Sequence, residues 1–494
     1  MQFDYAEKSR IDISPKLDLK RKSALGQFMT PLPVASFMAA MFPPSEIEVC
    51  RLLDAGAGVG ALTSAFLDRW RTGGFGFSQV EATAHELDDD LRAHLGTTLA
   101  QYDHSKRLVL RIVPGDFIVQ TALAMLEGLA SRNYTHAILN PPYKKINNDS
   151  NHRQALSQVG IETVNLYTAF VALAIELMAP GGQLVAIIPR SFCNGTYYKP
   201  FRELLLAKTA LRAMHLFESR SNAFADDEVL QENIIIRLER GGAPGPVTVT
   251  TSTDSTFSDL ATHEHPFERI VLPGDAERFI HVPTSSEKTE LELSAGVRFT
   301  LDEIGVGIST GPVVDFRLKD HLRADPELAS VPILYPQHFT GADVVWPVSG
   351  GKKANSIMVN DMTMGWLMPN GFYCVVKRFS SKEERRRIVA AVVRPSAFPE
   401  GTEFLGLENH LNVFNEKRRG LPELLAYGLS VFMNSTAVDE AFRRFSGHTQ
   451  VNATDLKTLR YPSRMALLEL GAWGKANRGA DQQAIDEQFK RLGS

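Results

Sequence analysis

The sequence has little cysteine, with three residues among 494 and no Cys-x-x-Cys pair. This scarcity argues against a disulfide framework and against a structural zinc site. No apolar run approaches the ~20 residues that a membrane-spanning helix needs, and the polar N-terminus lacks the pattern of a signal peptide. We therefore expect a cytoplasmic protein without a metal site and without membrane contacts.

Strong charge of either sign is also absent overall, since the net charge is −4 with 22% charged and 44% apolar residues. This composition is typical of soluble proteins, and the length suits two or three domains. One stretch, from 352 to 387, is nevertheless basic, with eight lysines and arginines against three acids. Such a cluster fits either a nucleic-acid contact on one face or an ordinary solvated surface.

Alternating strand and helix patterns from about residue 25 to 240 predict a doubly wound, Rossmann-like α/β domain. The expected strands are 49–54, 80–86, 108–113, 136–139, 183–189, 215–217 and 233–238, and the expected helices include 61–70, 166–178 and 198–208.

A change of composition suggests where this domain ends. The run Gly-Gly-Ala-Pro-Gly-Pro at 241–246 has the composition of a linker. Short strand-like pieces follow it, and helical patterns return near 421–434, which favours a second domain of α+β type. The expected organisation is an N-terminal arm at 1–24, the α/β domain at 25–240, the α+β domain at 247–475 and a tail at 476–494.

A glycine-rich turn follows the first expected strand. Glycines allow a tight turn and a close approach of the backbone to a ligand, and the helix behind them adds unpaired N–H groups. An acid at the start of the turn suits a ligand with an ammonium group better than it suits a pyrophosphate. The residues expected to bind are Asp54, Ala55, Gly56, Gly58 and Gly60.

Acidic residues also end the next two strands. Glu86 could accept hydrogen bonds from the two hydroxyls of a ribose, which is a common role at this place in nucleotide-binding folds. Asp116 could accept from an adenine amino group of a cofactor, and Phe117 could stack on its ring. Each acid alone could equally be a helix cap or a solvated loop residue, but their order along the chain favours one binding site.

The most informative motif is Asn140-Pro141-Pro142-Tyr143, which directly follows an apolar strand. The two prolines stiffen the turn and have no N–H groups to donate. The Asn140 side-chain oxygen and a proline carbonyl can therefore accept both protons of one planar amino group. Tyr143 offers a flat face for stacking. This arrangement suits the amino group of adenine, or less often that of cytosine or of a glutamine amide.

Together these motifs resemble those of S-adenosylmethionine-dependent DNA adenine-N6 methyltransferases in which the cofactor motifs precede the catalytic one (the gamma order). The resemblance covers roughly residues 20–240. Gln27 to Pro31 resembles the motif in which Thr30 and Pro31 flank the methionine part of the cofactor, and Phe224 lies in a segment whose aromatic packs on the extruded base. Segments at 306–311 and 447–452 resemble type II modification enzymes of the PstI/BsuBI group.

The resemblance implies that Asn140, Pro141, Pro142 and Tyr143 are catalytic and that the second domain recognises a target in double-stranded DNA. An adenine would have to leave the helix stack to react, and Tyr143 and Phe224 would stack on it. Basic residues are candidates for DNA contacts, namely Lys144, Lys145, Lys352, Lys353, Lys377 and Arg378.

Three alternatives remain open from the sequence. An Asn-Pro-Pro-Tyr turn also suits methylation of RNA or of a protein glutamine, although a large basic second domain favours DNA. A non-catalytic DNA-binding subunit is disfavoured because both motifs are intact. A fused nuclease is disfavoured because only about 24 residues precede the first motif, so we expect any cognate restriction endonuclease to be a separate protein.

Overall fold

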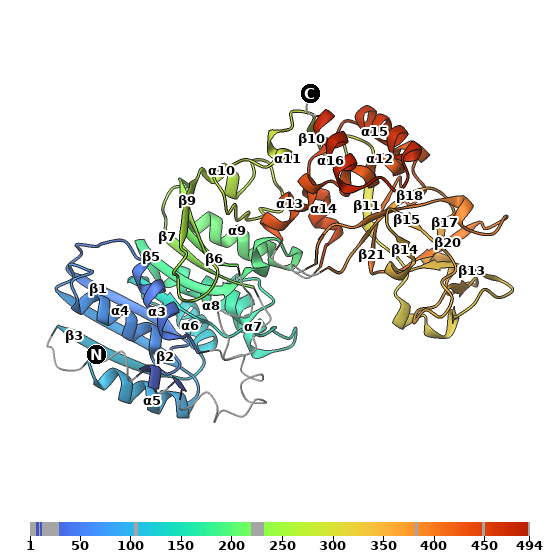
Figure 1. Ribbon diagram of the computed structural model, residues 1–494. Coiled ribbons are helices and arrows are strands. Elements are labelled where there is room, and N and C mark those ends of the chain that lie inside the picture. Colours follow the sequence, from blue (N-terminus) through green and yellow to red (C-terminus); the bar gives the residue numbers. More distant parts are fainter. Residues whose placement is uncertain are drawn as a thin grey trace. The chain divides into compact units, whose positions relative to one another are not determined.

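The computed structural model describes residues 6–8, 10–11, 29–102, 107–218, 232–380, 384–446 and 450–492. The chain divides into two compact units, Met1–Ser286 and Glu287–Ser494 (Figure 1).

The first unit is built on one large sheet. Among the described residues it has the strand order β3-β2-β1-β4-β5-β7-β6-β8-β9. Strands β3, β2, β1, β4 and β5 are parallel, whereas β7 runs antiparallel to both β5 and β6. The strands are β1 (Val49–Ala55), β2 (Gln79–Glu86), β3 (Leu108–Pro114), β4 (Tyr134–Leu139), β5 (Met178–Pro189), β6 (Thr209–Phe217), β7 (Asn233–Arg240), β8 (Val247–Ser252) and β9 (Ala261–His265).

Helices bury both faces of this sheet. On β5, Leu184 and Ala186 belong to the core beneath α8, whereas Val185 and Ile187 belong to the core beneath α3 and α4. Successive residues of a strand point to opposite faces, so a strand buried on both sides is apolar throughout. The helices are α3 (Leu32–Ala40), α4 (Ala61–Arg71), α5 (Asp89–Ala100), α6 (Phe117–Leu126), α7 (Asn151–Gln158), α8 (Leu166–Leu177), α9 (Lys199–Lys208) and α10 (Phe267–Ile270), with short 3-10 turns η1 (Arg190–Cys193) and η2 (Thr196–Tyr198).

The chain order places a binding site at one edge of this sheet. From β1 the chain proceeds outward to β2 and β3, and it then returns to lay β4 on the other side of β1. Ligands in such folds bind beyond the carboxyl ends of the strands at this reversal. The glycine turn, Glu86, Asp116 and the Asn-Pro-Pro-Tyr turn lie at the carboxyl ends of β1, β2, β3 and β4, so these four meet there.

The boundary between the two units lies later in the chain than the predicted domain boundary. Residues 241–246 are a connection within the sheet rather than a linker, because β8 pairs with β6 and β9 pairs with β8. Gly241 has a φ of +70°, which is a turn conformation. A run of glycine and proline marks a tight connection as readily as a domain boundary, and the first unit extends to Ser286.

The second unit contains, among its described residues, a six-stranded sheet (β11-β21-β18-β19-β15-β14), a five-stranded sheet (β12-β16-β13-β20-β17) and the pair β10-β22. Helices accompany these sheets, as expected for an α+β fold. The strands are β10 (Val297–Phe299), β11 (Gly307–Thr310), β12 (Leu322–Arg323), β13 (Ser330–Leu334), β14 (Phe339–Thr340), β15 (Asp343–Val344), β16 (Ser356–Met358), β17 (Met368–Pro369), β18 (Tyr373–Lys377), β19 (Ala390–Val393), β20 (Phe404–Leu407), β21 (Leu411–Asn415) and β22 (Tyr461–Pro462). The helices are α11 (Glu290–Leu293), α12 (Glu423–Met433), α13 (Thr436–Phe445), α14 (Ala453–Thr458), α15 (Arg464–Ala476) and α16 (Gln482–Arg491).

Two glycines let α12 and α15 pack closely. A Cβ at Gly428 would lie 1.8 Å from the carbonyl oxygen of Leu467, and a Cβ at Gly471 would lie 1.7 Å from that of Leu424. Any larger residue would therefore force the helices apart.

The residues expected as a C-terminal tail include all of α16. Phe489 of that helix is buried and stacks near Phe432 of α12. The C-terminus is thus part of the second unit's packing.

Candidate active site

One cavity of about 270 Å³ opens at the predicted edge of the sheet. It is lined by ten of the predicted residues, which are Thr30, Gly56, Gly58, Glu86, Asp116, Phe117, Asn140, Pro142, Lys144 and Lys145. Six other predicted residues do not line the cavity but lie within two positions, along the sequence, of a residue that does. These are Pro31, Asp54, Ala55, Gly60, Pro141 and Tyr143. Phe224 lies outside the described residues. The glycine turn and the Asn-Pro-Pro-Tyr turn therefore share one cavity.

The glycine turn has a backbone conformation that requires glycine at three positions. Gly56, Gly58 and Gly60 have φ values of +80°, +57° and +89°, in the left-handed region that other residues seldom adopt. At Gly60 a Cβ would also lie 2.9 Å from a methyl group of Leu95. The turn is anchored to β2, because the N–H groups of Gly56 and Ala57 donate to the carbonyl of His85.

Glu86 lies at the end of β2 and is buried. Its carboxylate accepts from the backbone N–H of Gly58 at 2.7 Å and from that of Asp88 at 2.8 Å. Burial raises its pKa, and the two N–H donors partly offset this rise. The carboxylate thus fixes the glycine turn and also faces the cavity, where each oxygen can accept a further hydrogen bond.

Asp54 is the acid that begins the turn, and it is buried at the end of β1. Its Oδ2 accepts from the Thr63 hydroxyl at 2.6 Å, whereas Oδ1 has no partner among the described residues. Burial raises its pKa to about 7, although the bond from Thr63 opposes the rise. Contact with a ligand's ammonium group stays a prediction for this residue.

Asp116 caps the start of α6, where its Oδ1 accepts from the N–H of Val119 at 3.1 Å. Its other oxygen, Oδ2, lies 2.6 Å from Nε2 of His152. His152 lines the same cavity, and sequence reasoning missed it. The run Ser150-Asn151 could have indicated a helix start there, and Ser150 does cap α7, but nothing local reveals a partner 36 positions away.

Aromatic rings line the cavity next to these polar groups. Phe117 begins α6 and lies 5.1 Å from the ring of Phe170 on α8, which was also not predicted. A Cβ at Gly56 would lie 3.6 Å from Phe170. These rings and the side chains of Leu87, Leu91 and Ile118 give the cavity an apolar wall suited to a planar ring.

Asn140 is held from two sides. Its Nδ2 donates to the Thr30 hydroxyl at 2.9 Å, and its Oδ1 accepts from the Tyr143 hydroxyl at 3.1 Å. The Tyr143 hydroxyl also reaches the carbonyl of Ile187 at 3.2 Å, and its burial raises its pKa far above the usual value. Thr30, expected only at the cofactor, therefore also contacts the catalytic motif.

The predicted DNA contacts occupy both units. Lys144 and Lys145 are exposed at the cavity. In the second unit Lys352 is exposed, whereas Lys353 pairs with Asp315 at 2.8 Å. The remaining two are half-buried, with the Lys377 ammonium 5.4 Å from the Phe339 ring and the Arg378 guanidinium donating to the Asn409 carbonyl at 3.1 Å.

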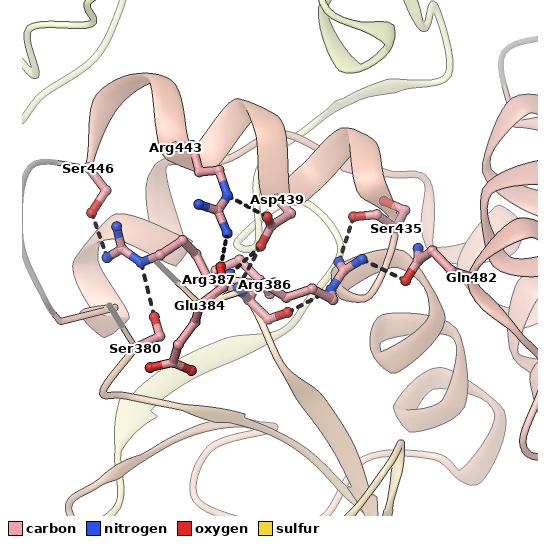
Figure 2. A network of polar contacts seen from close by, with 10 residues as sticks. Ser380, Glu384, Arg386, Arg387, Ser435, Asp439, Arg443, Ser446 and Gln482 are labelled. Carbon is pink, nitrogen blue, oxygen red and sulfur yellow. Dashed lines mark hydrogen bonds and ion pairs between the residues drawn. The ribbon is translucent and has the colours of Figure 1, made fainter. Parts of the chain in front are cut away.

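Two arginines of the basic stretch serve the fold rather than the surface (Figure 2). Arg387 is 1% exposed, and its guanidinium donates to the hydroxyls of Ser380 and Ser446. Asp439 accepts from the backbone N–H groups of Arg387 and Ile388. The excess of positive charge counted along the sequence therefore overstates what this stretch offers to DNA.

Arg386 extends this network from α13 to α16. It donates to the Gln482 side chain of α16 at 2.7 Å and to the carbonyl of Ser435 at 2.9 Å (Figure 2). Burial lowers its pKa, although nearby carboxylates oppose this effect. Such arginines behave as structural hydrogen-bond donors.

The family model named Eco57I restriction-modification methylase matches residues 102–224. Together with the fold, this match defines the class as an α/β methyltransferase. The type II methyltransferase M.BsuBI of Bacillus subtilis is 48% identical, over 99% of this chain and 98% of its own length. M.PstI of Providencia stuartii is 41% identical, over 92% and 90%. The chain belongs to this family of type II methyltransferases.

A solved structure has a similar fold over most of this chain. The nuclease-deletion mutant of the Type ISP restriction-modification enzyme LlaGI, in complex with a DNA substrate mimic, aligns with 94% of this chain and 56% of its own. The TM-score is 0.54 at 11% identity, so this likeness concerns the fold alone.

Family membership confirms several predictions from the sequence. The protein is a DNA methyltransferase of the restriction-modification type, and its methyl donor is S-adenosylmethionine. Membership of this family does not support the alternatives of RNA methylation, protein-glutamine methylation or a non-catalytic role. Within the described part of the chain, no helix is long and apolar enough to cross a bilayer.

Proposed function

We propose that this enzyme methylates N6 of an adenine that has been turned out of double-stranded DNA. The observation that supports this proposal is the position of Asn140, whose amide is fixed by Thr30 and Tyr143 at the cavity that the glycine turn also lines. An acceptor held in one orientation beside a ligand cavity suits the transfer of a group to an amine.

The cavity fits S-adenosylmethionine, which supplies an electrophilic methyl group on a sulfonium sulfur. The left-handed glycines bring backbone close to a ligand, Glu86 offers acceptors for ribose hydroxyls, and Phe117 offers an apolar face for adenine. The residues to which we assign cofactor binding are Thr30, Pro31, Asp54, Ala55, Gly56, Gly58, Gly60, Glu86, Asp116 and Phe117. The buried Oδ1 of Asp54, which has no partner among the residues that the structure describes, supports a positively charged group nearby.

On the target side, Asn140 Oδ1 and the Pro141 carbonyl accept the two amino protons. A carbonyl oxygen has two lone pairs, so Oδ1 can accept from Tyr143 and from the target together. Holding both protons keeps the amino nitrogen lone pair directed at the methyl group. Pro142 stiffens the turn, and the rings of Tyr143 and Phe224 stack on the base.

The DNA is held by basic residues outside the reacting groups. Lys144 and Lys145 contact the target strand beside the cavity, and Lys352, Lys353, Lys377 and Arg378 provide contacts from the second unit. A separately encoded restriction endonuclease is the counterpart of a type II modification enzyme. Protection of host DNA places the enzyme in the cytoplasm.

A product analysis tests the choice of base. Duplex DNA methylated by the enzyme is digested to nucleosides and measured by mass spectrometry. We expect N6-methyladenine, whereas N4-methylcytosine as the product would refute the adenine assignment.

The role of Asn140 is tested by Asn140→Ala, with Asn133→Ala as the control because Asn133 is exposed before β4. We expect Asn140→Ala to bind S-adenosylhomocysteine normally and to lose about 10²-fold or more of the transfer rate, as for other oriented hydrogen-bonding groups. Undiminished turnover in Asn140→Ala would refute this role.

A further inference from the structure

The segment after the Asn-Pro-Pro-Tyr turn forms one wall of the cavity. Lys144, Ile146, Asn147, Ser150 and His152 all line it. The base of this wall is tied to the start of α8, because Ile146 donates to the Val164 carbonyl and Leu166 donates to the Lys144 carbonyl, each at 2.8 Å.

At its other end the wall is joined to the lining residues at the start of α6. His152, in the first turn of α7, contacts the Asp116 carboxylate at 2.6 Å, and each side chain is 30% exposed. Asp116 and Phe117 line the same cavity. The pair therefore links two segments of the cavity wall that are far apart in sequence.

The directions of the two pKa shifts favour the charged form of both partners. Burial raises the pKa of Asp116, but the hydrogen bonds from His152 and from the N–H of Val119 outweigh burial and bring it below the usual value. The hydrogen bond to Asp116 raises the pKa of His152, against burial and the nearby charge of Lys144. A charge-assisted bond of this kind is roughly twice as strong as a neutral one.

Both oxygens of Asp116 are thereby held, one by the α6 backbone and one by His152. A carboxylate fixed in this way presents its remaining acceptor capacity in one direction only. Without His152 the carboxylate could rotate, and a polar contact between α7 and α6 would be lost.

We propose that His152 is a positioning residue of the methyl-donor site, which orients the Asp116 carboxylate and holds the wall 144–152 against the start of α6. This inference rests on the proposed assignment of the cavity to the methyl donor. The protonated imidazole holds Asp116 more strongly than the neutral one, so affinity should fall as pH rises through the raised pKa of His152.

Within the described part of the chain, His152 faces Asp116 at the start of α6 and Lys144 on its own wall segment. His85, Glu86 and Lys145 line the same cavity. S-adenosylhomocysteine is a suitable probe, because it carries no net charge at neutral pH and its binding is measured without turnover.

The test compares affinities for S-adenosylhomocysteine by calorimetry at a pH below the usual His152 pKa of 6.5 and at a pH well above it, so that the range spans the raised value. Because Asp54, with a pKa raised to about 7, titrates in the same range, each affinity is expressed relative to that of His152→Gln at the same pH. His152→Gln keeps a donor without the charge, so the wild type should bind about fivefold more tightly than this variant at the low pH and should lose that advantage at the high pH, the difference between a charged and a neutral hydrogen bond. His152→Ala should bind more weakly than His152→Gln and show the same pH profile.

His94→Ala is the control, since His94 is exposed on α5. It should keep the wild-type affinity and pH profile. If His152→Ala does not fold, as judged by circular dichroism, His152→Gln carries the test. A wild-type pH profile in His152→Gln would overturn the proposal.

Glu86→Gln separates this proposal from the assignment of the cavity. If Glu86→Gln weakens binding whereas His152→Ala does not, the cavity is correctly assigned and the role of His152 is refuted. If neither variant weakens binding, the donor binds elsewhere and both proposals fail.

Discussion

Replacing Thr30 with valine should slow methyl transfer more than it weakens binding of the methyl donor. Thr30 is only 4% exposed, and its hydroxyl accepts from Asn140 Nδ2 at 2.9 Å. Valine has nearly the same shape but cannot accept a hydrogen bond. The Asn140 amide would then lose the contact that holds its oxygen toward the target amine.

The size of the effect is bounded by the cost of removing an acceptor from a buried donor, because Asn140 is itself half-buried at the cavity. That cost is about 1–3 kcal/mol, and it is paid in the reacting geometry because there the amide must keep one orientation. Each 1.36 kcal/mol changes a rate tenfold, so we expect the transfer rate to fall about 5- to 150-fold.

A single-turnover experiment with enzyme in excess over duplex measures this rate directly. Thr30→Ser is the matched variant, because it keeps the hydroxyl and removes only the methyl group, so its rate should stay near that of the wild type. If Thr30→Val instead keeps the wild-type rate and raises only the KM for the donor, Thr30 acts on the cofactor alone and the reasoning is refuted.

Two further changes probe burial and packing. Asp54 has a folded-state pKa raised to about 7 from 3.8, so its contribution to stability is present at low pH and is lost as pH rises through about 7. Asp54→Asn should therefore gain melting temperature over the wild type at a pH above 7 but not at a pH below 3.8, and an equal gain at both would contradict the raised pKa. Gly428→Ala should cost about 1–3 kcal/mol in denaturant unfolding, as overpacking does, whereas Gly365→Ala, where a Cβ meets nothing within 4 Å, should not.

The parts of the site that local sequence determines were predictable. The run from Asp54 to Gly60 contains the glycines that its turn requires. The apolar strand before Asn140 predicts that the Asn-Pro-Pro-Tyr motif lies at a strand end. Because parallel strands end at one edge of a sheet, these motifs could be expected to meet, and they share one cavity.

The contacts that cross the fold were not predictable in this way. Thr30 and Asn140 are 110 positions apart, and Asp116 and His152 are 36 apart. No spacing rule relates residues that meet only when helices pack on a sheet. Composition was misleading where a residue type has two uses, as with the glycines and prolines at 241–246 and with the buried arginines 386 and 387.

The Tyr143 hydroxyl has two acceptors within reach, the Asn140 side chain and the backbone of Ile187 on β5. When the amine of an entering base also donates to Asn140 Oδ1, the phenol keeps the strand carbonyl as a second acceptor if its bond to Asn140 lengthens. The Tyr143 hydroxyl therefore retains a hydrogen bond whichever of the two acceptors it uses.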